Sequence, residues 1–270
     1  MLGTQLRPAT VEDYPNFLRF FAELGVSDPK PTLEHWCAHM LPTSAFFEQG
    51  GSLVGYAFSD IKPPLGYVRH VVIASEHRGQ GLGHSLMATL REYLVAHGCT
   101  RWCLNVKLSN TSARRLYQRI GMTDRYLTRV VRLAWPLTVR LPTPGANIRA
   151  RSLGEAEDRE VEPHFDLAPG ALQARRQRPG TFIATATPNS EPSRYLGLAV
   201  FDLNFPGAFP FRASSPSTAR ALLELLVNHR RPEHGEVQLV IEDDKDLADA
   251  LLRAGATPVF ELVHMAGDIA

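Results

Sequence analysis

Glycines at alternate positions follow an apolar run and could bind phosphate. The run Val71-Val72-Ile73 leads into Arg78-Gly79-Gln80-Gly81-Leu82-Gly83, and a helix is expected from Gly83 to His97. The start of a helix exposes backbone N–H groups that the helix itself cannot satisfy, and glycines let phosphate oxygens approach them. The positive end of the helix dipole and the charge of Arg78 strengthen this attraction. We predict an anion cradle here, the simpler alternative being a tight turn that binds nothing.

Two common phosphate-binding motifs do not fit this turn. It lacks the Gly-Lys-Ser/Thr of a P-loop. A dinucleotide fold would place an acidic residue after the next strand, about 20 residues on, and Thr100 to Val106 contains none. The turn therefore predicts a diphosphate-bearing group bound in another way.

A second group of residues follows the expected strand Arg101 to Val106. It has helical spacing and comprises Asn110, Ala113, Leu116, Tyr117 and Gly121. A helix here would place Tyr117 near the reactive end of the bound group. The alternative is a tyrosine that only packs against Ala113 and Gly121.

Together these segments resemble the GNAT N-acetyltransferase superfamily. Arg78-x-x-Gly81-x-Gly83 is similar to its acetyl-CoA pyrophosphate loop. Leu104-x-Val106-x-x-x-Asn110-x-x-Ala113-x-x-Leu116-Tyr117-x-x-x-Gly121-Met122 is similar to its second sequence block. The opening Leu6-Arg7-Pro8-Ala9-Thr10-x-Glu12-Asp13 is similar to its usual start. The resemblance covers roughly the first half of the chain, and two motifs at compatible spacing are more specific than either alone.

The resemblance implies an acetyl-CoA-dependent N-acetyltransferase that acts on a primary amine of a small molecule or peptide by direct transfer. Backbone groups of Val71 and Ile73 would bind the pantetheine arm, and those of residues 79–84 the pyrophosphate. Tyr117 would be the general acid for the departing thiolate. The implied donor-binding residues are Val71, Val72, Ile73, Arg78, Gly79, Gln80, Gly81, Leu82, Gly83, His84 and Asn110. Alternatives are a non-catalytic CoA-binding regulatory module, an acyltransferase-like scaffold, or a longer acyl group such as succinyl.

No general base is evident. Relatives carry Glu or His at positions that correspond here to Tyr67, Arg69 and Asn105, and neither Arg69 nor Asn105 is a base at neutral pH. Tyr67 is the second predicted catalytic residue, acting through a water. The other open candidates are His70 if a bulge turns it, Glu34, His35 and a loop carboxylate. An amine that is already partly neutral would need no base.

The amino-acid composition limits the classes of partner that the protein is expected to bind. A hydrophobic content of 44% is that of a globular protein, and a net charge of +1 argues against nucleic acid or an anionic membrane as partner. Cys37, Cys99 and Cys103 show no metal-ligand spacing, so no metal is expected. No apolar run of signal-peptide or membrane-spanning length is evident, so we expect a cytoplasmic protein, monomeric or homodimeric.

The expected fold is α/β (α+β), with two GNAT-like domains, each a mixed, mostly antiparallel sheet flanked by helices. Pro142, Pro144 and Gly145 suggest a boundary between residues 1–141, the catalytic domain, and residues 142–270. The second half repeats the first in outline, and Pro258 to Met265 is expected to be its terminal strand. Ala168 to Gly180, rich in Arg and Pro, is expected as a solvated loop, the alternative being a segment that reaches toward the catalytic half.

The second half lacks both motifs. Ser215 and Pro216 stand where the glycine turn would be and predict a self-capped helix. Leu251 or Leu252 takes the place of the tyrosine. We therefore expect a degenerate copy that lacks the pyrophosphate loop and a single active centre in the chain.

Overall fold

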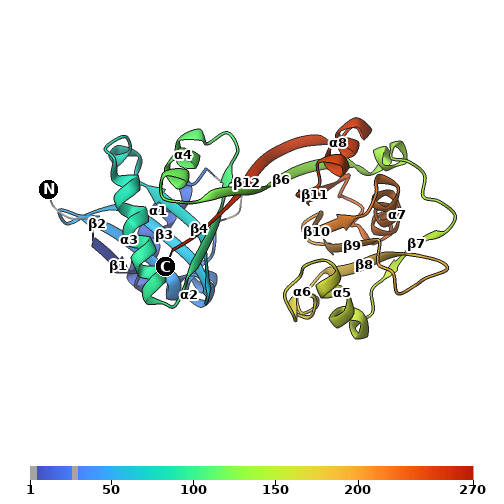
Figure 1. The fold of residues 1–270 in the computed structure, drawn as a ribbon, viewed down its shortest axis with the longest axis horizontal. Coiled ribbons are helices and arrows are strands. Elements are labelled where there is room, and N and C mark those ends of the chain that lie inside the picture. Colours follow the sequence, from blue (N-terminus) through green and yellow to red (C-terminus); the bar gives the residue numbers. More distant parts are fainter. Residues whose placement is uncertain (1–4, 26–29, 270) are drawn as a thin grey trace. The chain divides into compact units, whose positions relative to one another are not determined.

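The computed structural model describes residues 5–25 and 30–269, which form β-sheet covered by helices (Figure 1). The first half contains β1 (Gln5–Pro8), α1 (Tyr14–Glu23), α2 (Leu33–His39), β2 (Ser44–Gln49), β3 (Ser52–Lys62), β4 (Leu65–Ile73), α3 (Leu82–Ala96), β5 (Arg101–Lys107), α4 (Thr111–Arg119) and β6 (Thr123–Ala134). The second half contains β7 (Ile148–Ser152), α5 (Asp158–His164), α6 (Ala171–Arg176), β8 (Thr181–Pro188), β9 (Gly197–Asp202), β10 (Gly207–Ala213), α7 (Pro216–Leu226), β11 (Glu236–Glu242), α8 (Lys245–Ala254) and β12 (Thr257–Asp268).

The strands follow the same pattern in both halves. Their order is β1-β2-β3-β4-β5-β12-β6-β11-β10-β9-β8-β7. The runs β1 to β4 and β7 to β10 are antiparallel, whereas β4 pairs with β5, and β10 with β11, in parallel. The prediction of an α/β fold with mixed, mostly antiparallel sheets is confirmed.

The chain forms two compact units, and its last strand contributes to both. Unit 1 comprises Met1–Tyr126 with Leu262–Ala270, and unit 2 comprises Leu127–Glu261. In unit 1, residues 262–268 of β12 pair antiparallel with β5. In unit 2, residues 128–134 of β6 pair antiparallel with β11. Each half of the sequence therefore supplies a strand to the unit built mainly from the other half.

This arrangement differs from the expected boundary between residues 141 and 142. The strand predicted as Pro258 to Met265 exists. It was expected to complete the second domain, but its end instead pairs with β5 in unit 1. Alternating apolar residues indicate that a segment is a strand without indicating which neighbour it pairs with.

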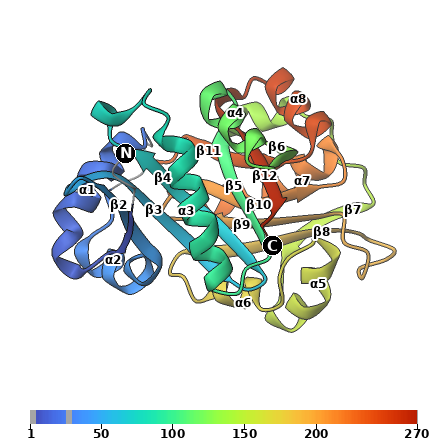
Figure 2. The same ribbon diagram turned by 60° about the vertical axis from the view of Figure 1, so that its left-hand side comes forward.

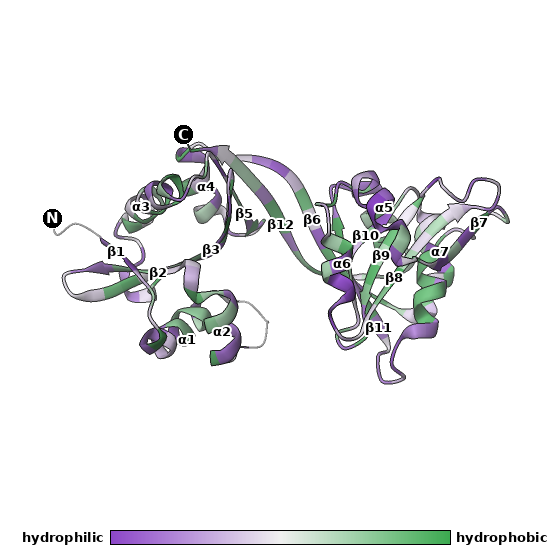
Figure 3. Cartoon of the chain, turned by 90° about the horizontal axis from the view of Figure 1, so that it is seen from below, coloured by the Kyte–Doolittle hydropathy of each residue, from purple (hydrophilic) through white to green (hydrophobic). Residues whose placement is uncertain are grey.

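In unit 1, helices cover both faces of the sheet, with α1 and α2 on one side and α3 and α4 on the other (Figure 3). Phe17 and Phe20 of α1 and Trp36 of α2 are fully buried against Tyr56 of β3. On the opposite face α3 packs on β3 and β4 (Figure 2). A Cβ on Gly66 would lie 2.8 Å from Leu94 Cδ2, so any larger residue there would force the Leu94 side chain to shift.

Unit 2 repeats this construction, with α5 and α6 over one core and α7 and α8 over another. The repeat extends to polar contacts. Arg7 Nη1 donates to Asp13 Oδ2 over 2.7 Å, and Arg151 Nη2 donates to Glu157 Oε1 over 2.6 Å. Both carboxylates also accept a backbone N–H three residues upstream, at Thr10 and Gly154. The counterpart of Arg7 is therefore Arg151.

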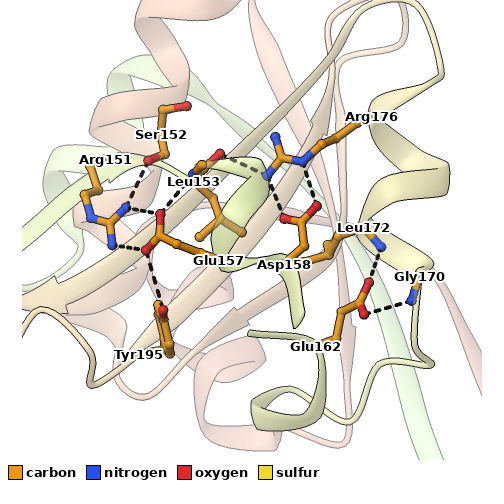
Figure 4. A network of polar contacts seen from close by, with 11 residues as sticks. Arg151, Ser152, Leu153, Glu157, Asp158, Glu162, Gly170, Leu172, Arg176 and Tyr195 are labelled. Carbon is orange, nitrogen blue, oxygen red and sulfur yellow. Dashed lines mark hydrogen bonds and ion pairs between the residues drawn. The ribbon is translucent and has the colours of Figure 1, made fainter. Parts of the chain in front are cut away.

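The segment expected as a solvated loop, Ala168 to Gly180, instead contains helix α6 fixed by two carboxylates (Figure 4). Arg176 donates to both carboxylate oxygens of Asp158, over 2.8 and 2.9 Å. Glu162, which is 3% exposed, accepts backbone N–H groups of Gly170 and Leu172, each at 2.8 Å. These partners lie outside the segment, so local composition did not reveal them.

We expect Arg176→Ala to lower the free energy of unfolding by about 3 kcal/mol, because it leaves the buried carboxylate of Asp158 without its partner. Urea unfolding measures the change. Arg194→Ala is the matched control, since its ion pair with Glu191 is long, 3.9 Å, and exposed, so its loss should cost about 0–1 kcal/mol. Equal effects of the two changes would show that the Arg176 pair does not hold α6.

Candidate active site

The site begins where two neighbouring strands of unit 1 diverge. β4 and β5 pair from Leu65 and Arg101 as far as Val68 and Leu104, and over the described strands their pairing ends there. β4 continues to Ile73 and stays paired with β3 along its other edge. The register shift between Phe58 and Ser59 leaves Arg69 as an extra residue, which is a β-bulge. Beyond Val68, the edge of β4 that faces β5 has no strand partner among the described strands, so an extended ligand could add there as a strand.

A cavity of about 430 Å³ lies beside this edge. Its lining includes residues 71–73, Arg78, Gly79, Gly83, Asn110 and Tyr117. The structure thus brings together the two segments that the sequence indicated, although they are separated by helix α3 and strand β5. Tyr67, Gln80, Gly81, Leu82 and His84 are not part of this lining.

The glycine turn has the backbone conformation that its sequence predicts. Gly79 and Gly81 have φ of +77° and +79°, values that residues with a Cβ rarely adopt. Gly81 immediately precedes α3, and within the described chain no side chain caps this helix start. Gly83 is helical, and a Cβ there would lie 2.9 Å from Leu116 Cδ2. The turn therefore presents the first backbone N–H groups of α3, while Gly83 allows α3 and α4 to approach closely.

Arg78 is held beside the turn by a carboxylate that the sequence did not single out. Its Nη2 donates to Glu23 Oε2 over 2.8 Å, and its Nε donates to the carbonyl oxygen of Ile73 over 2.9 Å. Glu23 comes from α1, lines the same cavity and also accepts the N–H of Ser75 at 2.8 Å. Glu23 therefore orients Arg78 and partly balances its charge.

Helix α4 carries Tyr117 to the cavity. The Tyr117 side chain is buried, and burial raises its pKa to about 12. Asn110 caps this helix, because its Oδ1 accepts the N–H of Ala113 and the hydroxyl of Ser112, each at 3.2 Å. Asn110 thus has a structural role in starting the helix, and its contact with pantetheine stays a prediction.

The second half carries different residues at the positions that correspond to Tyr117 and to the glycine turn. The cap Asp244 starts α8 as Asn110 starts α4, and the seventh residue after each cap is Leu251 and Tyr117 respectively. The carbonyl oxygens of both accept an N–H from five residues downstream. Leu251, not Leu252, is therefore the counterpart of Tyr117. The predicted self-capped helix is also present, since Ser215 Oγ accepts the N–H of Thr218 at 3.2 Å.

Some of the open base candidates lie apart from the cavity. His70 packs against Phe21 and Phe58, and burial lowers its pKa to about 4, with a smaller contribution from the charge of Arg69. Its Nδ1 is buried without a hydrogen-bond partner among the described residues. Glu34 and His35 are exposed on α2.

Tyr67 lies in a group that the sequence did not reveal. The ring of His264, from β12, is T-shaped to Tyr67, with centroids 6.2 Å apart. It stacks on Tyr126 at 4.6 Å, and its Nδ1 lies 2.8 Å from Asn105 Oδ1. The guanidinium of Arg69 lies over the Tyr67 ring, 3.8 Å from its centroid. His264 escaped sequence reasoning because it is 159 residues from Asn105, and no local motif marks it.

The described residues offer neither a metal site nor a membrane-spanning helix. Residues 5–25 and 30–269 contain no cluster of His, Cys, Asp and Glu suited to hold a metal ion. No helix in the described part of the chain is long and apolar enough to cross a membrane.

Residues 9–122 match the family model described as the acetyltransferase (GNAT) family. An uncharacterized N-acetyltransferase from Methanocaldococcus jannaschii is 36% identical over 81 residues, which are 30% of this chain and 52% of that protein. N-alpha-acetyltransferase 40 from Saccharomyces cerevisiae is also 36% identical over 81 residues, 27% of this chain and 28% of that protein. The N-terminal part of this chain is therefore similar to the GNAT acetyltransferase family. The chain spans about half or less of the length of these relatives.

Solved structures extend the likeness in fold to the whole chain. A GCN5-related N-acetyltransferase from Sphaerobacter thermophilus aligns with a TM-score of 0.71 and 18% identity, covering 98% of this chain and 96% of that one. A tandem GNAT protein from the clavulanic acid biosynthesis pathway aligns with a TM-score of 0.65 and 17% identity, covering 99% of both chains. The full chain therefore has the tandem GNAT fold.

Proposed function

We propose that this protein transfers the acetyl group of acetyl-CoA to a primary amine, at a single donor site in unit 1. The observation that carries the proposal is the cavity between the glycine turn, the free edge of β4 and Tyr117. The first backbone N–H groups of α3 would hold the diphosphate. The edge of β4 over residues 71–73 would hold pantetheine as an added strand, which leads the thioester toward Tyr117.

The reaction follows from these placements. The neutral amine attacks the thioester carbonyl carbon, so that a C–N bond forms and the C–S bond breaks. The Tyr117 hydroxyl donates its proton to the departing thiolate, and the amine gives up one proton. Because burial raises its pKa to about 12, Tyr117 keeps its proton across the neutral and mildly alkaline range until the thiolate needs it.

Unit 2 supports a single donor site in the chain. Leu251 has no proton to donate, and the side chain of Ser215 already accepts one of the backbone N–H groups at the start of α7, that of Thr218. We therefore assign no acyl-donor binding to unit 2.

Acetyl transfer to a small panel of amines tests the function. The intact protein would be incubated with acetyl-CoA and phenethylamine, spermidine or a peptide with a free α-amino group. Mass spectrometry should detect one added acetyl group on at least one amine, with equimolar release of free CoA thiol. Acetyl-CoA binding without transfer to any of them would instead favour a non-catalytic CoA-binding module. Absence of binding would favour an acyltransferase-like scaffold.

A further inference from the structure

Strand β12, from the second half of the sequence, contributes an imidazole to unit 1. Strand β12 pairs with β5 so that His264 stands directly opposite Asn105. Asn105 follows Leu104, which is the last residue of β5 to pair with β4. His264 therefore lies beside the point where the strands diverge. The cavity lining on β4 begins at Val71, three residues beyond Val68, which is roughly 10 Å along a strand.

Strand geometry also fixes which face the imidazole occupies. Leu104 and Val106 are buried on one face of β5, so Asn105 between them projects to the other. Tyr67 pairs with Cys103, two residues before Asn105, and thus shares that face. The ring contact of 6.2 Å between Tyr67 and His264 places the imidazole there as well. Trp102, on the opposite face, lines a hollow along α3.

The contact with Asn105 defines the protonation of the ring. The amide oxygen of Asn105 can only accept a hydrogen bond, and it lies 2.8 Å from His264 Nδ1. In the neutral ring Nδ1 therefore carries the proton, and the basic lone pair is on Nε2. A histidine oriented by a hydrogen bond through Nδ1 is a common arrangement for a group that moves protons near neutral pH. Tyr126, stacked at 4.6 Å, fixes the plane of the ring.

His70, the other histidine in the described strands, lacks this combination. His70 is enclosed by aromatic rings, and its lowered pKa makes it a poor proton acceptor at neutral pH. Among the described residues, the ionisable groups that share the His264 face include Tyr67, Arg69, Arg101, Cys103, Lys107 and Tyr126, and also Asp60, which pairs with Tyr67. Arg69 is paired with Asp60 at 2.6 Å, and Lys107 Nζ donates to the carbonyl oxygen of Gly25 at 2.8 Å.

We propose that His264 is the general base of the acetyl transfer, an inference that rests on the proposed function. As the amine nitrogen bonds to the thioester carbon, its proton passes to His264 Nε2 and is later released to solvent. The proton for the thiolate comes from the Tyr117 hydroxyl, which solvent reprotonates. Asn105 is a positioning residue that keeps Nε2 basic and aimed at the amine. The protein would therefore complete its active centre with a strand from the other half of its own sequence.

The test compares His264→Asn with wild type, using whichever panel amine is acetylated fastest. Asparagine keeps a donor near the position of Nδ1 but has no basic nitrogen in place of Nε2. We expect kcat/KM for the amine to fall about 10²-fold at neutral pH, and the acidic limb of its pH profile to disappear. The dissociation constant of acetyl-CoA should stay within about twofold. His97→Asn is the matched control, because His97 also bonds through Nδ1, to Tyr93 O at 2.8 Å, but lies at the exposed end of α3.

A second pair of variants separates chemistry from folding. Asn105→Ala should lower kcat/KM about tenfold, and Asn105→Asp, which again offers an acceptor to Nδ1, should restore most of the loss. If the wild type is active and His264→Asn keeps the wild-type pH profile, the role of His264 is overturned while the proposed function stands. Wild type that binds acetyl-CoA but acetylates no amine would overturn the proposed function and this inference with it.

Discussion

Replacing Tyr117 with phenylalanine is expected to lower kcat roughly 10²- to 10³-fold, with little change in the KM for acetyl-CoA. The variant keeps the ring that packs at the buried position on α4 but removes the only proton it can donate. Without that proton the CoA sulfur must leave as an unprotonated thiolate. Steady-state release of free thiol, measured with one amine from the panel, checks the prediction.

The control for this change is Tyr93→Phe. Tyr93 is on α3, its pKa is also raised by burial, and its ring contacts His97 at 4.2 Å, away from the cavity lining. Its activity should match wild type. An equal, small effect of both changes would indicate that Tyr117 only fills space, as a tyrosine at helical spacing often does.

Replacing Gly81 with aspartate is expected to weaken acetyl-CoA binding roughly 10- to 100-fold. The carboxylate would stand at the start of α3, where the diphosphate would bind, and would repel it. Gly51→Asp is a closely matched control. Gly51 and Gly81 share a φ of +79°, and a Cβ on either would meet nothing within 4 Å. Both variants therefore carry the same backbone strain, and only the Gly81 change adds charge to the turn.

Calorimetric titration with acetyl-CoA gives both dissociation constants. Gly51→Asp, in the hairpin between β2 and β3, should bind as wild type does. If the two variants weaken binding equally, strain and not phosphate recognition explains the loss. If neither weakens it, the glycine turn does not bind the diphosphate.

The local parts of the site could be predicted from the sequence. The glycine turn, the helix after it and the cap at Asn110 each depend on neighbouring residues, because dihedral preference and capping act within a few positions. The structure places Gly79, Gly83 and Tyr117 around one cavity, as the paired motifs suggested. Their chemical roles stay predictions until a ligand is bound.

The non-local parts could not be predicted. Nothing in residues 257–268 indicates that their end pairs with β5 and not with a strand of their own half. The base candidates that the sequence names consequently all lie in the first half, where His70 is packed among aromatic rings and Glu34 is exposed. Helix α6 was missed for a similar reason, because its partners Asp158 and Glu162 precede it in a separate helix.

The crystal structure of the intact protein with acetyl-CoA would test the central claim most directly. We predict one ligand per chain, in unit 1, with its diphosphate within hydrogen-bond distance of the backbone nitrogens of residues 79–84. Its pantetheine should run along residues 71–73, with the thioester sulfur beside Tyr117. A ligand at Ser215 in unit 2, or one whose sulfur lies away from Tyr117, would contradict the account.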